Sequence, residues 1–135
     1  MATSTATATF ACDIQSVWDT VTSLEETAWR SDLGRIEVLN DRQFVEYTEE
    51  GYATTFTVTA MEPCRRWEFD LENDNIKGHW TGIFTQKGEQ TEISFTEEVA
   101  VKKPLLKLLM KPYLKAYLKK QQAQYVSDLR SALSL

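Results

Sequence analysis

Polar turns divide the stretch from Leu33 to Val101 into short segments, and this division constrains the fold more than any other feature. The turns are Asn40-Asp41, Glu49-Glu50-Gly51, Pro63-Cys64, Asn73-Asp74-Asn75 and Lys87-Gly88-Glu89. The segments between them are rich in β-branched and aromatic residues and cover Leu33–Leu39, Gln43–Thr48, Tyr52–Met61, Arg66–Leu71, Ile76–Thr85 and Thr91–Val101. Strands joined by short turns pair with their neighbours, so we predict a six-stranded antiparallel meander.

Apolar and polar residues alternate within these segments. Because successive side chains of a strand point to opposite sides, every second residue shares a face. The residues that this alternation assigns to one face of the middle segments are Phe56, Val58, Ala60, Trp67, Phe69 and Leu71. The pattern therefore predicts a sheet that is packed on one side and wet on the other.

The residues before Leu33 predict one strand and two short helices. Thr3–Ala11 alternates threonine with mostly small residues, a period-two pattern typical of a strand. Asp13 can cap a helix whose buried face is formed by Ile14, Val17, Trp18 and Val21. Ser23 and Glu26 have the capping-box spacing, so we predict a second helix that ends at Trp29.

The residues from Pro104 to Leu135 are rich in Leu, Lys, Ala and Gln and predict helix. Pro112 interrupts the pattern, so we expect a short leading helix or a kink, followed by one long helix over Tyr113–Ala132. At 1.5 Å per residue this helix would be roughly 30 Å long, enough to cross a small sheet. Its predicted inward stripe is Tyr113/Leu114, Tyr117/Leu118, Gln121, Tyr125 and Leu129.

The order of these elements resembles the START-like superfamily, also called SRPBCC, which includes polyketide cyclase/dehydrase-like proteins. The local features that carry the resemblance are Phe10-x-x-Asp13-Ile14-x-x-Val17-Trp18, Trp29, Thr91 after Gly88, and Asp128-Leu129-x-x-Ala132-Leu133. The likeness extends over residues 1–135 as a single domain. It implies an α+β helix-grip fold, in which a curved seven-stranded antiparallel sheet (strand, helix, helix, six strands, helix) wraps around the long C-terminal helix. It carries over no catalytic residues.

The helix-grip fold implies a ligand cavity where the sheet and the helix do not meet. We assign its wall to Trp67, Phe69, Trp80, Phe84, Ile93, Phe95 and Glu97 of the sheet and to Tyr113, Tyr117 and Gln121 of the helix. Such a wall suits a flat, ring-containing or lipid-like ligand. The alternative is that these large side chains fill the space themselves.

Glu97 is the weak candidate for a catalytic residue. It shares the parity of Phe95 and Val99 and should therefore point inward. A buried carboxyl has a raised pKa and could exchange a proton with a ligand hydroxyl or enol. The alternative is a bulge at Glu97-Glu98 that turns both side chains to solvent.

The sequence also predicts where the side chains of three further polar residues lie. His79 should face solvent, because its neighbour Trp80 takes the dry face. Arg30 could reach the cavity mouth and meet an anionic head group, or end a short helix in solvent. Tyr47 points inward if Val45 does, and its hydroxyl could then bind a ligand oxygen or a core partner.

Charge and composition exclude several classes of function. A net charge of −5 disfavours nucleic-acid binding, which depends on Lys and Arg. Two cysteines and one histidine cannot complete a structural zinc site, and no cofactor motif is present, so we expect neither metal nor cofactor. No apolar run could span a bilayer, and we expect a soluble, cytoplasmic monomer or homodimer without integral membrane association. Seven lysines near the C-terminus indicate a solvated helix face or, alternatively, contact with an anionic membrane.

Three functions remain open. The first is binding of a small apolar molecule without chemistry. The second is a polyketide cyclase- or dehydratase-like enzyme that uses Glu97 and tyrosine hydroxyls in the same cavity. The third is a protein-interaction module, against which the lack of a large excess of exposed apolar residues counts.

Overall fold

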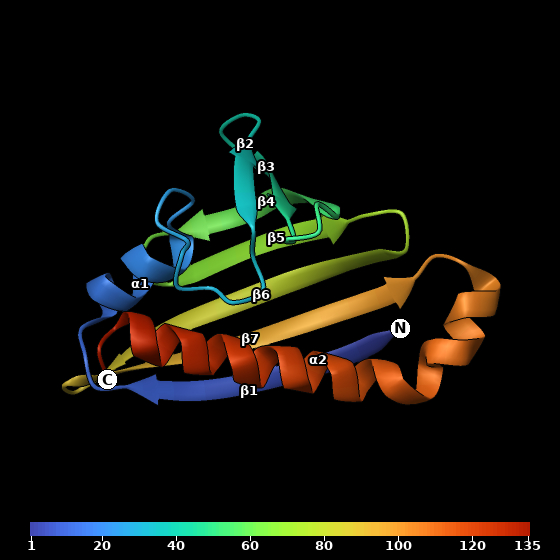
Figure 1. Ribbon diagram of the computed structural model, residues 1–135. Coiled ribbons are helices and arrows are strands. Elements are labelled where there is room, and N and C mark those ends of the chain that lie inside the picture. The colour runs from blue at the N-terminus through green and yellow to red at the C-terminus, as the bar shows by residue number, and fades with distance from the viewer.

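The strands form one antiparallel sheet in which the first strand pairs with the last. The computed structural model describes residues 1–135. Its elements are β1 (Ala2–Phe10), α1 (Ile14–Thr22), β2 (Arg35–Val38), β3 (Gln43–Tyr47), β4 (Ala53–Glu62), β5 (Arg66–Glu72), β6 (Ile76–Lys87), β7 (Gln90–Val101) and α2 (Pro104–Ala132) (Figure 1). The strand order is β1-β7-β6-β5-β4-β3-β2, which confirms the predicted meander and the seven-stranded helix-grip sheet.

The two faces of the sheet follow the predicted parity with one exception. Trp67, Phe69 and Leu71 are buried on the inner face. In β4 the register shifts between Val58 and Ala60, so that Ala60 pairs with the outward-facing Glu68. The assignment of Ala60 to the dry face is therefore wrong, because an extra residue in a strand reverses the parity beyond it.

Helix α1 begins as predicted, but no second helix follows it. The Asp13 carboxylate accepts a hydrogen bond of 2.8 Å from the backbone N–H of Ser16. Ser23 likewise accepts from the N–H of Glu26 at 3.1 Å, yet the residues up to Trp29 form a loop. A single capping contact does not offset the cost of nucleating so short a helix, and Trp29 packs instead against Tyr125 at a ring distance of 5.4 Å.

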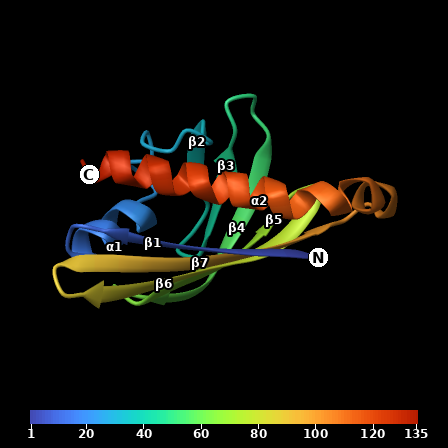
Figure 2. The ribbon, with the colours of Figure 1, turned by 90° about the horizontal axis from the view of Figure 1, so that it is seen from below.

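Helix α2 is one continuous element that contains Pro112. Its first turns, orange in Figure 1, run at a steep angle to the rest of the helix, which is the predicted kink. The long remainder lies along β1 and β7 (Figures 1 and 2). The sheet curves from β7 up to β3 and β4, so that these strands also face α2 (Figure 2).

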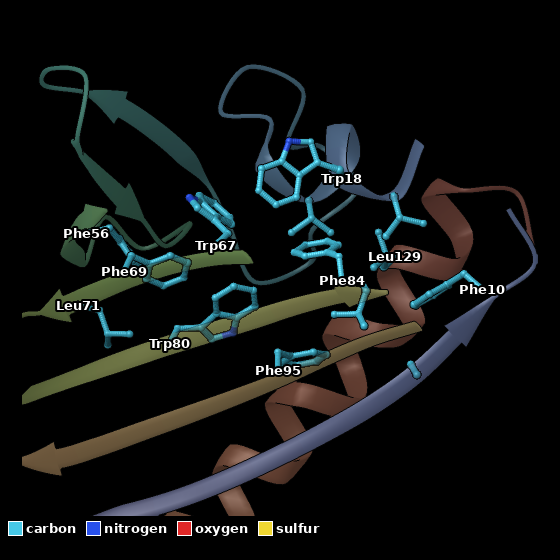
Figure 3. Packing of buried hydrophobic residues seen from close by; sticks show 14 of the residues in the cluster. Phe10, Trp18, Phe56, Trp67, Phe69, Leu71, Trp80, Phe84, Phe95 and Leu129 are labelled. Atoms are coloured by element: carbon cyan, nitrogen blue, oxygen red, sulfur yellow. The ribbon is translucent and has the colours of Figure 1, made fainter. Parts of the chain in front are cut away.

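The core between the sheet, α1 and α2 is mainly aromatic (Figure 3). Phe69 and Trp80 stack with their planes 4° apart and their ring centroids 4.9 Å apart. A Cβ atom at Gly82 would lie 2.5 Å from the Trp80 ring, so glycine at this position lets the indole lie flat over the strand. These aromatic side chains form the floor on which the site is built.

Candidate functional site

A cavity of about 460 Å³ lies between the inner face of the sheet and α2. Its wall contains residues of β2 to β7, of the loop after α1 and of α2. Tyr52 and Tyr117 belong to this wall and have exposed fractions of 41% and 54%. The cavity therefore reaches solvent beside these two tyrosines.

Most of the predicted wall residues are found in the wall. They are Trp67, Phe69, Trp80, Phe95, Glu97, Tyr117 and Gln121. The aromatic members pack against one another and still leave the cavity beside them, so they do not fill the space completely. Their contact with a ligand stays a prediction.

Phe84, Ile93 and Tyr113 lie outside the wall, contrary to the prediction. Phe84 is buried nearer α1, where its ring meets Trp18 edge to face at 4.9 Å. Ile93 is buried in the same part of the core. Tyr113 is 70% exposed, because its neighbour Leu114 takes the inward position on α2.

The inward stripe of α2 differs from the predicted stripe at its glutamine, where it is shifted by one position. Gln122, not Gln121, is buried. Its side chain accepts a hydrogen bond of 2.7 Å from the Ser4 hydroxyl and donates one of 2.8 Å to the Ser4 carbonyl oxygen. Gln121 is exposed at the cavity rim.

A charged cluster occupies the wall on the side of β3. Arg30 donates two hydrogen bonds to Glu46, at 2.8 and 3.0 Å, and two to Asp32, at 3.2 and 2.9 Å. Burial alone would lower the pKa of Arg30, but the charges of Glu46 and Asp32 and the hydrogen bonds to them raise it. Arg30 therefore lines the cavity as a cation that is already paired, and an anionic head group would compete with Glu46 for it.

Glu97 points into the cavity from β7. It lies opposite Trp80 of β6 and Ser4 of β1, and the register of β7 is unbroken, so the alternative of a bulge at Glu97-Glu98 is wrong. Burial raises the pKa of Glu97 to about 7, and the charges of Glu46 and Asp32 add to the effect of burial while Arg30 opposes it. No hydrogen bond within the chain stabilises its carboxylate.

Tyr125 of α2 stands near the same charges. Its ring meets Phe95 edge to face at 5.5 Å, and the Arg30 guanidinium carbon lies 5.9 Å from the ring centroid. Burial is the main cause that raises the pKa of its hydroxyl. The phenol therefore stays neutral and can donate a hydrogen bond in the wall of the cavity.

Tyr47 and His79 are engaged elsewhere. The Tyr47 hydroxyl donates to Glu37 at 3.1 Å, and the Arg35 guanidinium carbon lies 3.7 Å from the Tyr47 ring centroid. The condition for an inward hydroxyl is not met, because Phe44 and not Val45 packs in the aromatic core, although Tyr47 borders the cavity. His79 pairs with Glu68 at 2.8 Å and with Asp70 at 2.6 Å. It lies on the outer face of the sheet, as predicted.

Sequence reasoning missed Glu46, Asp32 and Tyr125 as polar members of the site. The signal for Glu46 was present, since it shares the parity of the buried Phe44, which stacks on Phe56 at 5.1 Å. Tyr125 was placed on the inward stripe but not assigned a role. Nothing in the sequence indicated that Asp32 of the loop would meet Arg30.

The polar groups of the wall do not form a metal site, since no group of three or more His, Cys, Asp or Glu residues is arranged to hold a metal ion. What the wall provides is an apolar surface, the paired cluster around Arg30, the Glu97 carboxyl with a pKa of about 7, and the buried neutral phenol of Tyr125. Neither helix is both long and apolar enough to cross a bilayer.

Sheet, helix and cavity together define a START-like helix-grip protein. Residues 1–133 match the family described as polyketide cyclase / dehydrase and lipid transport, and the chain belongs to this family. The family match confirms the resemblance found in the sequence. No curated protein matches the chain.

Solved structures share the fold at low sequence identity. A conserved protein of Geobacillus kaustophilus has a TM-score of 0.84 and 10% identity, over 98% of this chain and 95% of its own. A START superfamily protein of Mycobacterium smegmatis has a TM-score of 0.83 and 15% identity, over 98% and 97%. DynU16, from the dynemicin biosynthetic locus, has a TM-score of 0.77 and 15% identity, over 98% of this chain and 47% of its own. Identities this low show the common fold alone.

Proposed function

We propose that the protein binds a small, largely apolar molecule that carries one hydrogen-bonding group. The observation that carries this proposal is the cavity of about 460 Å³, in which Glu97 is a carboxyl without a hydrogen-bonding partner. Its volume lies within the range of roughly 300 to 1,000 Å³ typical of ligand pockets. The family description, which names polyketide chemistry and lipid transport, supports the same class of ligand.

The shape and chemistry of the wall favour a ring-containing or lipid-like body. Trp80, Phe95 and Leu118 offer apolar surface, while the polar groups gather around Arg30 and Glu97. A ligand hydroxyl or carbonyl at that end could accept a hydrogen bond from protonated Glu97 or from neutral Tyr125. An apolar molecule without such a group would leave the carboxyl unsatisfied at a cost in affinity.

A fluorescent apolar probe tests the proposal. Thr54 lines the cavity from β4, so Thr54→Trp should fill part of it and weaken binding of the probe by about tenfold or more. The matched control is Thr59→Trp on the same strand, where Thr59 is exposed and the probe should bind as to the parent. No probe binding by the parent, or equal binding by both variants, would contradict the proposal.

The second candidate function is proton transfer on a bound polyketide-like molecule. The pKa of about 7 at Glu97 favours it, because a general acid or base works best when its pKa lies near the working pH. Glu97 would take a proton from a carbon next to a carbonyl group, while Tyr125 would donate a hydrogen bond to the carbonyl oxygen. The proton would then return to the ligand from the same carboxyl.

This chemistry is measurable without knowing the natural substrate. Deuterium exchange into an aromatic β-diketone, followed by NMR, should be faster with the parent protein than with Glu97→Gln, while both bind the fluorescent probe. Equal exchange rates with intact probe binding would leave the protein as a carrier. Loss of probe binding in Glu97→Gln would instead assign the residue to ligand recognition.

A further inference from the structure

The first turns of α2 project beyond the end of the sheet (Figures 1 and 2). They carry apolar side chains that nothing in the chain covers. The large side chains exposed there are Leu105 (73%), Leu108 (71%), Leu109 (63%) and Tyr113 (70%). We call residues 104–113 the projecting segment. Its exposed leucines are grouped, unlike the scattered surface apolar residues that any protein has.

The exposed side chains extend the apolar face of the helix beyond the part that lines the cavity. Leu106 and Met110 of the same turns line the cavity. At about 100° per residue, Leu105 and Leu109 lie roughly 100° from Leu106 and Met110 around the helix, and Lys107 and Lys111 lie about 100° from them on the other side. An apolar face of this width is normally covered. The outer face of the projecting segment thus lacks a partner in this chain.

The charged side chains of this part of the chain have a single sign. Between Lys102 and Ser127 the chain has seven lysines and no acidic residue, although its net charge is −5. Lys107, Lys111, Lys115 and Lys119 recur every four residues and form a stripe along one side of α2. Of the seven lysines only Lys102 makes an ion pair, with Glu72 at 2.6 Å. The others are free to meet an external anion.

We propose that the projecting segment docks on an anionic lipid surface. Leucines that enter the lipid boundary, flanked by lysines at the level of the head groups, are the arrangement by which amphipathic helices bind such surfaces. A second copy of the chain fits less well, because packing two such segments together would bring two groups of lysines without any acidic residue into one interface. Charge complementarity therefore selects the anionic membrane.

The segment that docks on the lipid surface also forms part of the cavity wall. Leu106 and Met110 belong to the same turns as the exposed leucines, and they line the cavity. A bend separates these turns from the part of α2 that packs along β1 and β7 (Figure 1), and Pro112 lies inside this helix. An apolar molecule leaving the lipid would therefore meet one wall of the cavity at the docking surface. The docking proposal itself does not depend on what the cavity binds.

Vesicle flotation tests the docking surface. The full chain should bind vesicles of phosphatidylcholine mixed with phosphatidylglycerol, bind phosphatidylcholine alone at least tenfold more weakly, and lose binding as salt is raised. Lys107→Gln/Lys111→Gln/Lys115→Gln should weaken binding to the mixed vesicles about a hundredfold. Leu105→Ser/Leu109→Ser should also abolish it.

Matched controls separate docking from general charge effects. Lys77→Gln/Lys87→Gln removes two exposed lysines from β6 and should bind as the parent does. All variants should keep the parent's near-UV dichroism and cooperative unfolding, because every substituted side chain is exposed. Equal binding to both vesicles, no binding to either, or full binding by the lysine variant would overturn the proposal. The proposal would also be overturned if the parent bound no vesicles and instead formed a concentration-dependent dimer that Leu105→Ser/Leu109→Ser did not form.

Discussion

Glu46 of β3 holds Arg30 through two hydrogen bonds of 2.8 and 3.0 Å, and this pair sets the charge around Glu97. The Glu46 carboxylate raises the pKa of Glu97 while the Arg30 cation lowers it. Asp32 adds a second negative charge on the same side. The titration of the cavity carboxyl is therefore controlled by a loop and a short strand far from β7 in the sequence.

Opposite changes in this pair should move the pKa of Glu97 in opposite directions. Glu46→Gln removes a negative charge and should lower the pKa, whereas Arg30→Met removes the positive charge and should raise it. Carboxyl-resolved NMR titration of Glu97 measures both. Shifts in the same direction would mean that the pair acts on Glu97 by moving the backbone and not through its charge.

Arg30→Met should also destabilise the fold. The substitution leaves Glu46 without its partner at a site where the two side chains are only 16% and 15% exposed. Removing one partner of a buried ion pair lowers the free energy of unfolding by about 3 to 5 kcal/mol. Urea unfolding measures this loss, and Arg35→Met provides the control because the Arg35 side chain is 64% exposed. Equal effects of the two substitutions would contradict the prediction.

The pH dependence of stability should report the burial of Glu97. The folded chain binds this proton more tightly than the unfolded chain, whose carboxyl has the ordinary pKa of 4.5. The contribution is fully present below pH 4.5 and is lost as pH rises to about 7, with a total decline of about 3 kcal/mol. Glu97→Gln should lack this decline in urea unfolding measured from pH 4.5 to 8. A parallel decline in parent and variant would show that Glu97 is solvated.

His79 should titrate above its ordinary value on the outer face of the sheet. Burial alone would lower its pKa, but the hydrogen bonds to Glu68 and Asp70 raise it above 6.5. The raised pKa of His79 contributes to the free energy of unfolding. This contribution is fully present below pH 6.5 and is lost as pH rises through the pKa of the folded state. Because His79 is the sole histidine, one imidazole NMR signal follows the titration. Asp70→Asn should lower the pKa, and an unchanged value would remove Asp70 from the interaction.

The hydrogen bonds between Gln122 and Ser4 should contribute measurably to the free energy of unfolding. Gln122→Ala would leave the buried Ser4 hydroxyl and carbonyl oxygen without these partners, at a cost of about 1 to 3 kcal/mol. Gln121→Ala, one position earlier and exposed, should change the free energy of unfolding by less than about 0.5 kcal/mol. Similar losses in the two variants would contradict the assigned stripe.

The strands were more predictable than the helix because their geometry leaves fewer choices. A strand residue has two possible faces, so the inward position of Glu97 followed from Phe95 and Val99 alone. Adjacent residues of a helix differ by only about 100° in direction, and Tyr113 and Leu114 were both compatible with the stripe. The structure resolved this choice in favour of Leu114.

Contacts that depend on loops were not predictable in the same way. Arg30 lies in the loop that replaces the expected second helix, and it binds Glu46, sixteen positions later in the sequence. No periodic pattern encodes such a pairing. The parity of Phe44 would have placed Glu46 inside, but this signal was missed, and a carboxylate on an inward position indicates a buried charge without naming its partner.

The pairing of β1 with β7 has a kinetic consequence for the newly made chain. Thr5 bonds to Thr96 at 2.9 Å across 91 positions, and Ser4 bonds to Gln122 across 118. Such distant contacts carry a large loop-closure entropy and slow folding relative to local pairing. During synthesis β1 emerges before every other element of this domain, whereas its partner strand β7 and the helix that covers it emerge after all the others. The strand β1 is therefore among the last elements of the domain to be fixed in place.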